Sequence, residues 1–342
     1  EKPMALSAAF VLAAAAPLAK HAAAFHPSHL SLRNFPEIDF FSKPTSALRF
    51  PLLNAAASDA DDHDTDAATD ATSDRVAFAC LLADAARRAI MPRFRRPVKV
   101  ELKAEGGRSP AQSLSPVTAA DREAERTMRD LIEDRYPSDG IYGEEYGAVR
   151  TNAEYVWVLD PIDGTRSFMG GKPTFGTLIA CLRNGAPQIG IIDHPALDER
   201  WVGVTGMTTT LNGSNVSVRA GGPSTLSDAV VCATSPDMFR PGEEFDKFKS
   251  VRDRCRSALY GCDCYGYALV ASGFGADAVV EADLGLYDYC AVVPVVEGAG
   301  GMITDWEGRR LTLSNHESSQ GRVVACSNGD LHEEMMAILG PP

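Results

Sequence analysis

The chain has 342 residues, of which 45% are hydrophobic, and a formal net charge of −13 at pH 7. This length and composition suffice for a large buried core, built either as two domains or as one layered unit. The negative charge argues against nucleic acid as a partner, because no basic cluster interleaved with aromatic residues offsets it. We therefore expect any acidic substrate to be bound through cations.

Residues 1–58 form a leader that is rich in alanine and serine and poor in acids. Such a composition is typical of an organelle transit peptide. The alternative is a secretory signal, since residues 8–19 are an apolar stretch of suitable length, but no Lys or Arg lies between Met4 and this stretch. Twelve apolar residues are too few to span a bilayer, so we expect no membrane as a partner.

Residues 59–74 hold seven aspartates and no Lys or Arg. A segment of this composition is too polar to pack into a core. We expect it to be a disordered, solvated linker between the leader and a folded region that begins at residue 75.

The first half of the folded region, residues 75–221, shows both helical and strand patterns. Apolar residues at helical spacing predict a helix from Asp74 that ends near Pro92. Glycine and proline indicate a loop over residues 103–116. Thr118 is the expected N-cap of a second helix, with Asp121 in its first turn. A strand is expected at 155–160, and residues 174–204 are typical of an antiparallel meander.

The second half, residues 222–342, follows a Gly-Pro-Ser linker at 221–225. The pattern predicts strands at 229–234 and 279–282 and helices at 245–255, 265–272 and 332–339. Residues 289–298 suit a buried helix, although it contains Pro294, which is tolerated only in a first turn or at a kink.

Eight cysteines are scattered through apolar stretches rather than arranged in a disulfide-dense pattern. We expect most of them to be small buried hydrophobic side chains. Cys262 and Cys264 resemble half of a zinc clip, but no second Cys or His cluster completes four ligands.

The most informative segment is residues 157–165, Trp-Val-Leu-Asp-Pro-Ile-Asp-Gly-Thr. Pro161 fixes its own φ and favours an extended Asp160, while Gly164 lets the backbone approach a ligand closely. The carboxylates of Asp160 and Asp163 therefore converge on one small volume. Carboxylates without His or Cys suit Mg²⁺ or Mn²⁺, and amides at a helix start beyond Asp163 suit a phosphate.

Two further acids stand at the ends of predicted elements, Glu144 after a glycine and Asp288 at a helix start. Together, Gly143-Glu-Glu145, Asp160-Pro-Ile-Asp-Gly-Thr165 and Tyr287-Asp288 followed by Glu297-Gly-Ala-Gly-Gly301 resemble the inositol monophosphatase superfamily of Mg²⁺-dependent, lithium-sensitive phosphomonoesterases. The resemblance covers about residues 75–340. It implies a layered α/β/α/β/α sandwich, a metal site between the two halves, inhibition by Li⁺ and a homodimer.

Carried onto this sequence, the resemblance implies a complete set of site residues. The metal ligands are Glu144, Asp160, the carbonyl of Ile162, Asp163 and Asp288, with Asp121 for a further, weaker metal. Two or three Mg²⁺ ions neutralise the phosphate and activate water for an in-line displacement. Glu144 and Thr165, with Asp163 beside them, form the catalytic group that orients and deprotonates the water. The amides of Gly164 and Thr165 bind phosphate oxygens.

Within the superfamily, Leu259-Tyr-Gly-Cys-Asp-Cys-Tyr265 and the stretch 190–203 resemble plant-type histidinol-phosphate phosphatases of histidine biosynthesis, which implies a plastid location. Asp263 is the discriminating residue, because an aspartate there pairs with the ammonium or imidazolium group of histidinol. Glu281 matches the family's substrate-contacting acid. An exposed turn acid is the alternative reading of Asp263.

The main alternative function is an inositol 1-phosphate or L-galactose 1-phosphate phosphatase with the same mechanism, favoured if Asp263 points away from the pocket. An alternative of another class is a catalytically silent binding protein, but every expected metal carboxylate is present. One departure from the family is the longer segment before Ser115-Pro-Val-Thr118, which leaves the family's basic residue there unassigned.

Overall fold

The first helix begins earlier than its apolar pattern predicts. The computed structural model describes residues 63–97, 99–104 and 114–341, so the leader predicted for residues 1–58 lies outside the described residues. Helix α1 runs over His63–Ile90, so the described part of the predicted linker 59–74 is helical. Alanine favours a helix, and the Asp74 carboxylate accepts hydrogen bonds from Arg135 (3.0 Å) and from Tyr136 Oη (2.5 Å). These contacts tie α1 to the second helix, α2 (Ala119–Arg135).

The larger sheet has the strand order β10-β9-β8-β7-β6-β5-β3-β4. Its strands are β3 (Gly140–Gly143), β4 (Gly147–Val149), β5 (Tyr155–Asp163), β6 (Gly176–Arg183), β7 (Ala186–His194), β8 (Glu199–Val204), β9 (Thr210–Leu211) and β10 (Ser214–Asn215). Strands β6, β7 and β8 pair antiparallel, which confirms the predicted meander. Strand β5 extends to Asp163, with a register shift between Asp160 and Asp163.

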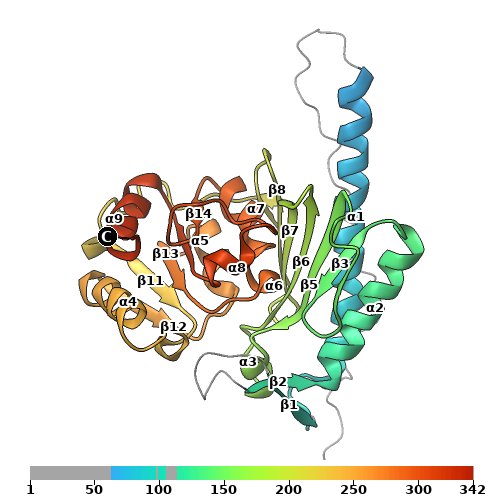
Figure 1. The fold of residues 1–342 in the computed structure, drawn as a ribbon, viewed down its shortest axis with the longest axis horizontal. Coiled ribbons are helices and arrows are strands. Elements are labelled where there is room, and N and C mark those ends of the chain that lie inside the picture. The colour runs from blue at the N-terminus through green and yellow to red at the C-terminus, as the bar shows by residue number, and fades with distance from the viewer. Residues whose placement is uncertain (1–62, 98, 105–113, 342) are drawn as a thin grey trace, which may run out of the picture. The chain divides into compact units, whose positions relative to one another are not determined.

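Helices α1 and α2 cover one face of this sheet (Figure 1). Leu82 of α1 and Met128 of α2 are fully buried against Trp157 and Ile179 of the sheet. The indole Nε1 of Trp157 donates to Asp139 Oδ2 at 3.0 Å, which satisfies its polar atom inside the core. The β-branched and aromatic residues of the meander therefore form a buried two-sided sheet.

The smaller sheet has the strand order β12-β11-β13-β15-β14. Its strands are β11 (Val230–Ala233), β12 (Ser257–Tyr260), β13 (Ala278–Glu281), β14 (Met302–Thr304) and β15 (Val323–Cys326). Strand β11 pairs parallel with β12 and β13, whereas β15 pairs antiparallel with β13 and β14.

Helices fill the space between the two sheets and cover the outer face of the smaller one (Figure 1). The inner helices are α5 (Tyr265–Ala271), α6 (Leu286–Tyr289) and α7 (Val292–Gly298), and the outer ones are α4 (Glu243–Arg254) and α9 (Gly329–Leu339). Val158 and Leu178 of the larger sheet share one core with Val279 and Ala325 of the smaller sheet. The predicted α/β/α/β/α sandwich is thereby confirmed.

Two local differences from the sequence pattern are found. The predicted helix at 289–298 is two helices, α6 and α7, and Pro294 lies in the first turn of α7, where no intrahelical amide bond is lost. The ends of the predicted loop 103–116 pair as strands β1 (Val100–Ala104) and β2 (Leu114–Thr118). Short helices α3 (Thr165–Met169) and α8 (His316–Ser319) are also present.

Two predictions from composition can be compared with the structure. Six cysteines are buried, whereas Cys255 and Cys262 are partly exposed, so most are indeed core side chains. Among the residues described, none of the helices combines the length and apolar character that a membrane span requires.

Candidate active site

The segment Asp160-Pro-Ile-Asp163 ends strand β5 at an irregularity in the sheet. The register shift between Asp160 and Asp163 lets Pro161 lie in the strand without removing a ladder hydrogen bond. Thr177 Oγ1 of the neighbouring strand donates to the carbonyl of Pro161 at 2.8 Å. The turn that carries both aspartates is therefore fixed by the sheet rather than by the carboxylates themselves.

Gly164 reverses the chain between β5 and α3. Its φ of 76° lies in the left-handed region, which glycine adopts at little cost. A Cβ at this position would lie 2.6 Å from Asp263 Oδ2, so only glycine leaves room for that carboxylate. Immediately afterwards, Thr165 Oγ1 donates to the carbonyl of Ile162 at 3.1 Å. The threonine hydroxyl and the predicted carbonyl ligand are thus in contact.

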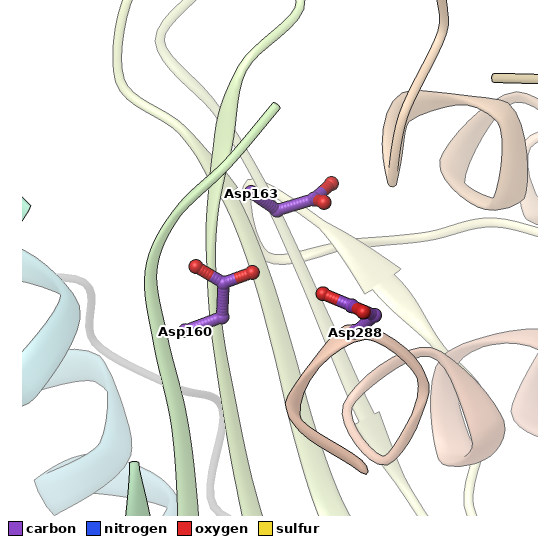
Figure 2. Close-up of side chains that lie close together, drawn as sticks. All are labelled: Asp160, Asp163 and Asp288. Carbon is purple, nitrogen blue, oxygen red and sulfur yellow. The ribbon is translucent and has the colours of Figure 1, made fainter. Parts of the chain in front are cut away.

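Asp288 reaches the same place from the layer between the sheets. It lies in the first turn of α6, and its Oδ2 accepts a hydrogen bond from the Gly285 amide at 2.6 Å. Ligand atoms of Asp160, Asp163 and Asp288 lie within 4.8 Å of one another. Figure 2 shows the three carboxylates around one common space.

Burial and mutual repulsion disfavour ionisation of these three carboxyl groups. Burial, followed by the charges of Glu144, Asp163 and Asp288, raises the pKa of Asp160 well above its usual value. Burial and the Asp263 charge raise the pKa of Asp163 to about 7. The pKa of Asp288 is likewise raised by burial, then by Asp163 and Glu144. Removing this repulsion requires either protons or a cation.

The donor set fits a hard divalent cation. Asp160 Oδ1 is buried and has no hydrogen-bond partner among the residues that the structure describes, which is the state of an oxygen available as a ligand. The three clustered residues offer oxygen alone, the donor that Mg²⁺ and Mn²⁺ prefer.

A pocket of about 490 Å³ opens beside the carboxylates. Its walls bring together most of the residues predicted from the sequence: Glu144, Asp160, Ile162, Asp163, Gly164, Thr165, Asp263 and Asp288. Arg166 is the basic residue of this lining, alongside seven acids that also include Asp237 and Asp283. The pocket is therefore strongly acidic.

Asp263 lies on a tight turn before α5. Its φ of 49° is a left-handed conformation that Asp tolerates better than most residues. Ser167 Oγ donates to Asp263 Oδ2 at 2.8 Å. Burial raises the pKa of Asp263, against the lowering effects of Ser167, Lys172 and Arg166. The alternative of an exposed turn acid is excluded, because the side chain lines the pocket.

Cys264, the residue after Asp263, contacts the cluster of Asp160, Asp163 and Asp288 through its main-chain amide. The amide of Cys264 donates to Asp163 Oδ2 at 2.6 Å. The turn is held on its other side by Lys172, whose Nζ donates to the carbonyl of Gly261 at 2.8 Å. One short turn therefore carries both the Asp263 carboxylate and the amide that donates to Asp163.

Two predicted residues do not line the pocket. Glu281 is 2% exposed, and it accepts hydrogen bonds from Thr234 N (3.1 Å), Thr234 Oγ1 (2.5 Å) and Tyr267 Oη (2.7 Å). Burial raises its pKa to about 8, against the lowering effect of these two partners. The predicted contact of Glu281 with the substrate stays a prediction; in the structure Glu281 supports Thr234, which lines the pocket.

Asp121 is the second of them. It is 1% exposed, and its Oδ2 accepts hydrogen bonds from Thr118 N (2.9 Å) and Thr118 Oγ1 (2.5 Å) in the capping box of α2. Its predicted N-terminal position is confirmed. Its role toward a further metal stays a prediction, since it is not part of the clustered group of carboxylates.

Sequence reasoning missed one wall of the pocket, which the loops after β11 and β13 form. The additional lining residues are Thr234, Ser235, Asp237, Met238, Ala282, Asp283 and Gly285. Asp283 also has a left-handed φ, 64°. A turn signal was present in Ser235-Pro-Asp237, but nothing in the sequence places that turn beside β5.

Known proteins share this arrangement. The inositol monophosphatase family model matches residues 72–340. The chain is 47% identical over 264 residues to the bifunctional phosphatase IMPL2, chloroplastic, of Arabidopsis thaliana, covering 75% of this chain and 72% of that protein. It is 34% identical over 278 residues to a histidinol-phosphatase of Streptomyces coelicolor, covering 78% and 97%.

Among solved structures, an inositol monophosphatase from Zymomonas mobilis superimposes with a TM-score of 0.67 at 42% identity, covering 78% of this chain and 98% of that one. The family match over residues 72–340 includes both sheets and the residues that line the pocket. The chain therefore belongs to the inositol monophosphatase family and is a phosphatase of that family.

Proposed function

We propose that this protein is a Mg²⁺-dependent phosphomonoesterase that hydrolyses L-histidinol phosphate to L-histidinol and phosphate. The observation that carries the proposal is the position of Asp263, whose carboxylate lines the same pocket as Asp160, Asp163 and Asp288. The clustered carboxylates suit a metal-bound phosphate, and Asp263 beside them suits a cationic group.

The metal ions would be held by residues of the motifs found in the sequence. Glu144, Asp160, the carbonyl of Ile162, Asp163 and Asp288 would hold two to three Mg²⁺ ions. When bound, these ions neutralise the phosphate dianion and lower the pKa of the attacking water.

The protein's own groups position the water and the phosphate. Thr165 Oγ1, already directed to the carbonyl of Ile162, orients the water together with Glu144, whose carboxylate accepts the proton. The amides of Gly164 and Thr165 precede the first intrahelical bonds of α3, so they donate to phosphate oxygens. Displacement is in line, without a phosphoenzyme.

The pocket holds more acidic residues than the metal ions require. Asp237, Asp263 and Asp283 line the pocket in addition to the proposed metal ligands. A polyol phosphate carries no positive charge to pair with these acids. The ammonium or imidazolium group of histidinol phosphate does, and a charge-assisted hydrogen bond to Asp263 both binds it and sets its orientation.

The relatives support the same substrate. Histidinol-phosphatases of Chlorobaculum parvum and Streptomyces coelicolor are 36% and 34% identical to this chain. The alternative substrates are inositol 1-phosphate and L-galactose 1-phosphate, hydrolysed by the same metal-dependent mechanism. The Zymomonas neighbour, named as an inositol monophosphatase, favours that alternative.

The deciding experiment compares phosphate release from L-histidinol phosphate and myo-inositol 1-phosphate with Mg²⁺, in the natural chain and in Asp263→Asn. Asparagine keeps the side-chain volume and tolerates the left-handed φ of this position. We expect a preference for histidinol phosphate, and a loss of about 10-fold or more in kcat/KM for that substrate alone in the variant.

Asp198→Asn serves as the matched control, since Asp198 is an exposed acid that is not among the pocket-lining residues and has a similar left-handed φ of 57°. Equal turnover of the two substrates by the natural chain would move the assignment to the polyol phosphatases. If the natural chain hydrolyses no phosphomonoester in the presence of Mg²⁺, the proposed metal-dependent mechanism is refuted.

We also propose a plastid location and a homodimeric assembly. The acid-poor composition of residues 1–58 supports plastid targeting, as does the 47% identity to a relative named as chloroplastic. Import and processing by isolated chloroplasts test the location, and the mass of the purified protein in solution tests the assembly.

A further inference from the structure

We infer that Glu125 is a positioning residue for the metal site: its buried carboxylate clamps the turn that carries Glu144. The inference rests on the proposed role of Glu144 as a metal ligand. Glu125 lies on α2, is not among the residues that line the pocket, and is 0% exposed.

The carboxylate of Glu125 binds two successive main-chain amides. Its Oε2 accepts from the amide of Glu145 at 2.7 Å, and its Oε1 accepts from the amide of Tyr146 at 3.1 Å. These are the two residues that directly follow Glu144. The peptide groups that set the direction of the Glu144 side chain are therefore held by a charged acceptor inside the protein.

Arg129 completes the clamp one helical turn later. Its Nε donates to Glu125 Oε1 at 2.7 Å, and this pair is nearly buried, with Arg129 14% exposed. Arg129 Nη2 donates to the carbonyl of Gly147 at the far end of the turn. The ion pair thus binds both ends of residues 145–147, and the charge of Glu125 is compensated.

Gly143 provides the space that the carboxylate occupies. A Cβ on Gly143 would lie 2.0 Å from Glu125 Oε1, which is far inside van der Waals contact. The glycine before Glu144 is therefore explained by the close approach of Glu125 and not by its own φ, which is not in the left-handed region.

The other side of Glu144 is fixed to the strand that carries the aspartates. The amide of Glu144 donates to the carbonyl of Leu159 at 3.2 Å, and Leu159 immediately precedes Asp160. The main chain of Glu144 is held on one side by the Leu159 carbonyl of β5 and on the other side by Glu125, through the next two amides. Main-chain contacts therefore set the position of Glu144.

The test is Glu125→Gln in the full-length protein, read out by the Mg²⁺ concentration for half-maximal activity and by the rise in unfolding temperature on adding Mg²⁺. The glutamine NH₂ group cannot accept from a second amide and cannot pair with Arg129. We expect the half-maximal Mg²⁺ concentration to rise by about 10-fold or more, the usual cost of losing an outer partner of a metal ligand. The Mg²⁺-induced rise in unfolding temperature should shrink in parallel.

Three further variants separate positioning from general stability. Gly143→Ala displaces the carboxylate from the other side and should raise the half-maximal Mg²⁺ concentration as well. Met128→Ala removes a buried side chain of the same helix and should lower the unfolding temperature without changing the Mg²⁺ requirement. Glu133→Gln removes the exposed pair with Arg150 and should change neither.

The outcomes distinguish the inference from the function on which it rests. If the natural chain binds and uses Mg²⁺, and Glu125→Gln has an unchanged Mg²⁺ requirement, the positioning role is refuted. The same holds if Met128→Ala shifts the requirement as far as Glu125→Gln. If the natural chain shows no Mg²⁺-dependent stabilisation and no turnover, the proposed function itself fails.

Discussion

Ser167 donates a hydrogen bond to Asp263 across 2.8 Å and thereby joins helix α3 to the turn before α5. The two residues lie on opposite halves of the chain. Because the hydroxyl satisfies one oxygen of a buried carboxylate, it fixes the direction in which the remaining lone pairs face.

Ser167→Ala should therefore lower kcat/KM for histidinol phosphate by about 10-fold, the worth of a hydrogen bond to a charged group. Because the metal cluster does not include Ser167, the Mg²⁺ requirement should stay unchanged. Steady-state kinetics at several Mg²⁺ concentrations measure both quantities. Ser227→Ala, at an exposed serine, is the control; an equal loss in both variants would contradict the specific role of Ser167.

Asp160→Asn should abolish turnover and raise stability in the absence of metal. The substitution removes a proposed ligand, so we expect activity to fall by more than about 100-fold, beyond the cost of losing an outer partner. It also removes a buried carboxyl group whose ionisation is opposed by burial and by its acidic neighbours, so the metal-free protein should unfold at a higher temperature. Thermal unfolding with EDTA and with Mg²⁺ checks both parts, and near-normal turnover would refute the assignment of the site.

Thr165 offers a test of the proposed water-orienting hydroxyl. Thr165→Val keeps the shape of the side chain but removes the donor to the Ile162 carbonyl, and should lower kcat by about 100-fold. Thr165→Ser keeps the hydroxyl and should retain most of the activity. The two kcat values, compared at saturating substrate and Mg²⁺, decide the question, since similar values in both variants would show that the hydroxyl has no part in the reaction.

His194 should make the folded state sensitive to mild acid. Burial lowers its pKa to about 4, although a hydrogen bond to the Phe175 carbonyl (2.8 Å) opposes the shift. The unfolded chain binds a proton near its ordinary pKa of 6.5, so between about pH 6.5 and about pH 4 the unfolded state binds more protons. Stability therefore falls as the pH is lowered through this window, by up to about 3 kcal/mol.

His194→Asn tests this origin, because asparagine keeps a donor for the Phe175 carbonyl but does not titrate. Urea unfolding of both proteins at about pH 7 and about pH 4.5 gives the free energies of unfolding. The difference in the free energy of unfolding between the natural chain and His194→Asn should be smaller at about pH 4.5 than at about pH 7. A difference that is the same at both pH values would assign the acid sensitivity to other groups.

The local part of the site could be predicted from the sequence. Asp160, Pro161, Asp163 and Gly164 lie within a few residues of one another, so their convergence depends on backbone restrictions of proline and glycine that any fold must obey. The same holds for Thr118 and its capping box, which local spacing identifies.

The non-local part could not be predicted from spacing. Asp288 was placed by resemblance to a family, and its contact with Asp160 depends on the packing of the inner helices against β5. The loop at 234–238 joins the pocket for the same reason. The hydrogen bonds of Glu281 could not be predicted either, because all four residues of β13 are buried and alternation along the strand gives no sign of which face meets the pocket.

The early start of α1 has a different cause. The aspartates of residues 63–74 predict a solvated segment by composition, yet this part of the chain is helical. A tertiary contact, from Asp74 to Arg135 and Tyr136, overrides the compositional rule.

The main-chain amide of Cys264, which directly follows Asp263, donates a hydrogen bond to Asp163. A peptide N–H is present whatever side chain occupies the preceding position, so a substitution of Asp263 that keeps its left-handed φ of 49° leaves this contact to Asp163 in place. Under the proposed role of Asp263, a substitution at this turn would change which phosphomonoester the pocket accepts. The carboxylate cluster that carries out the hydrolysis would keep its main-chain support.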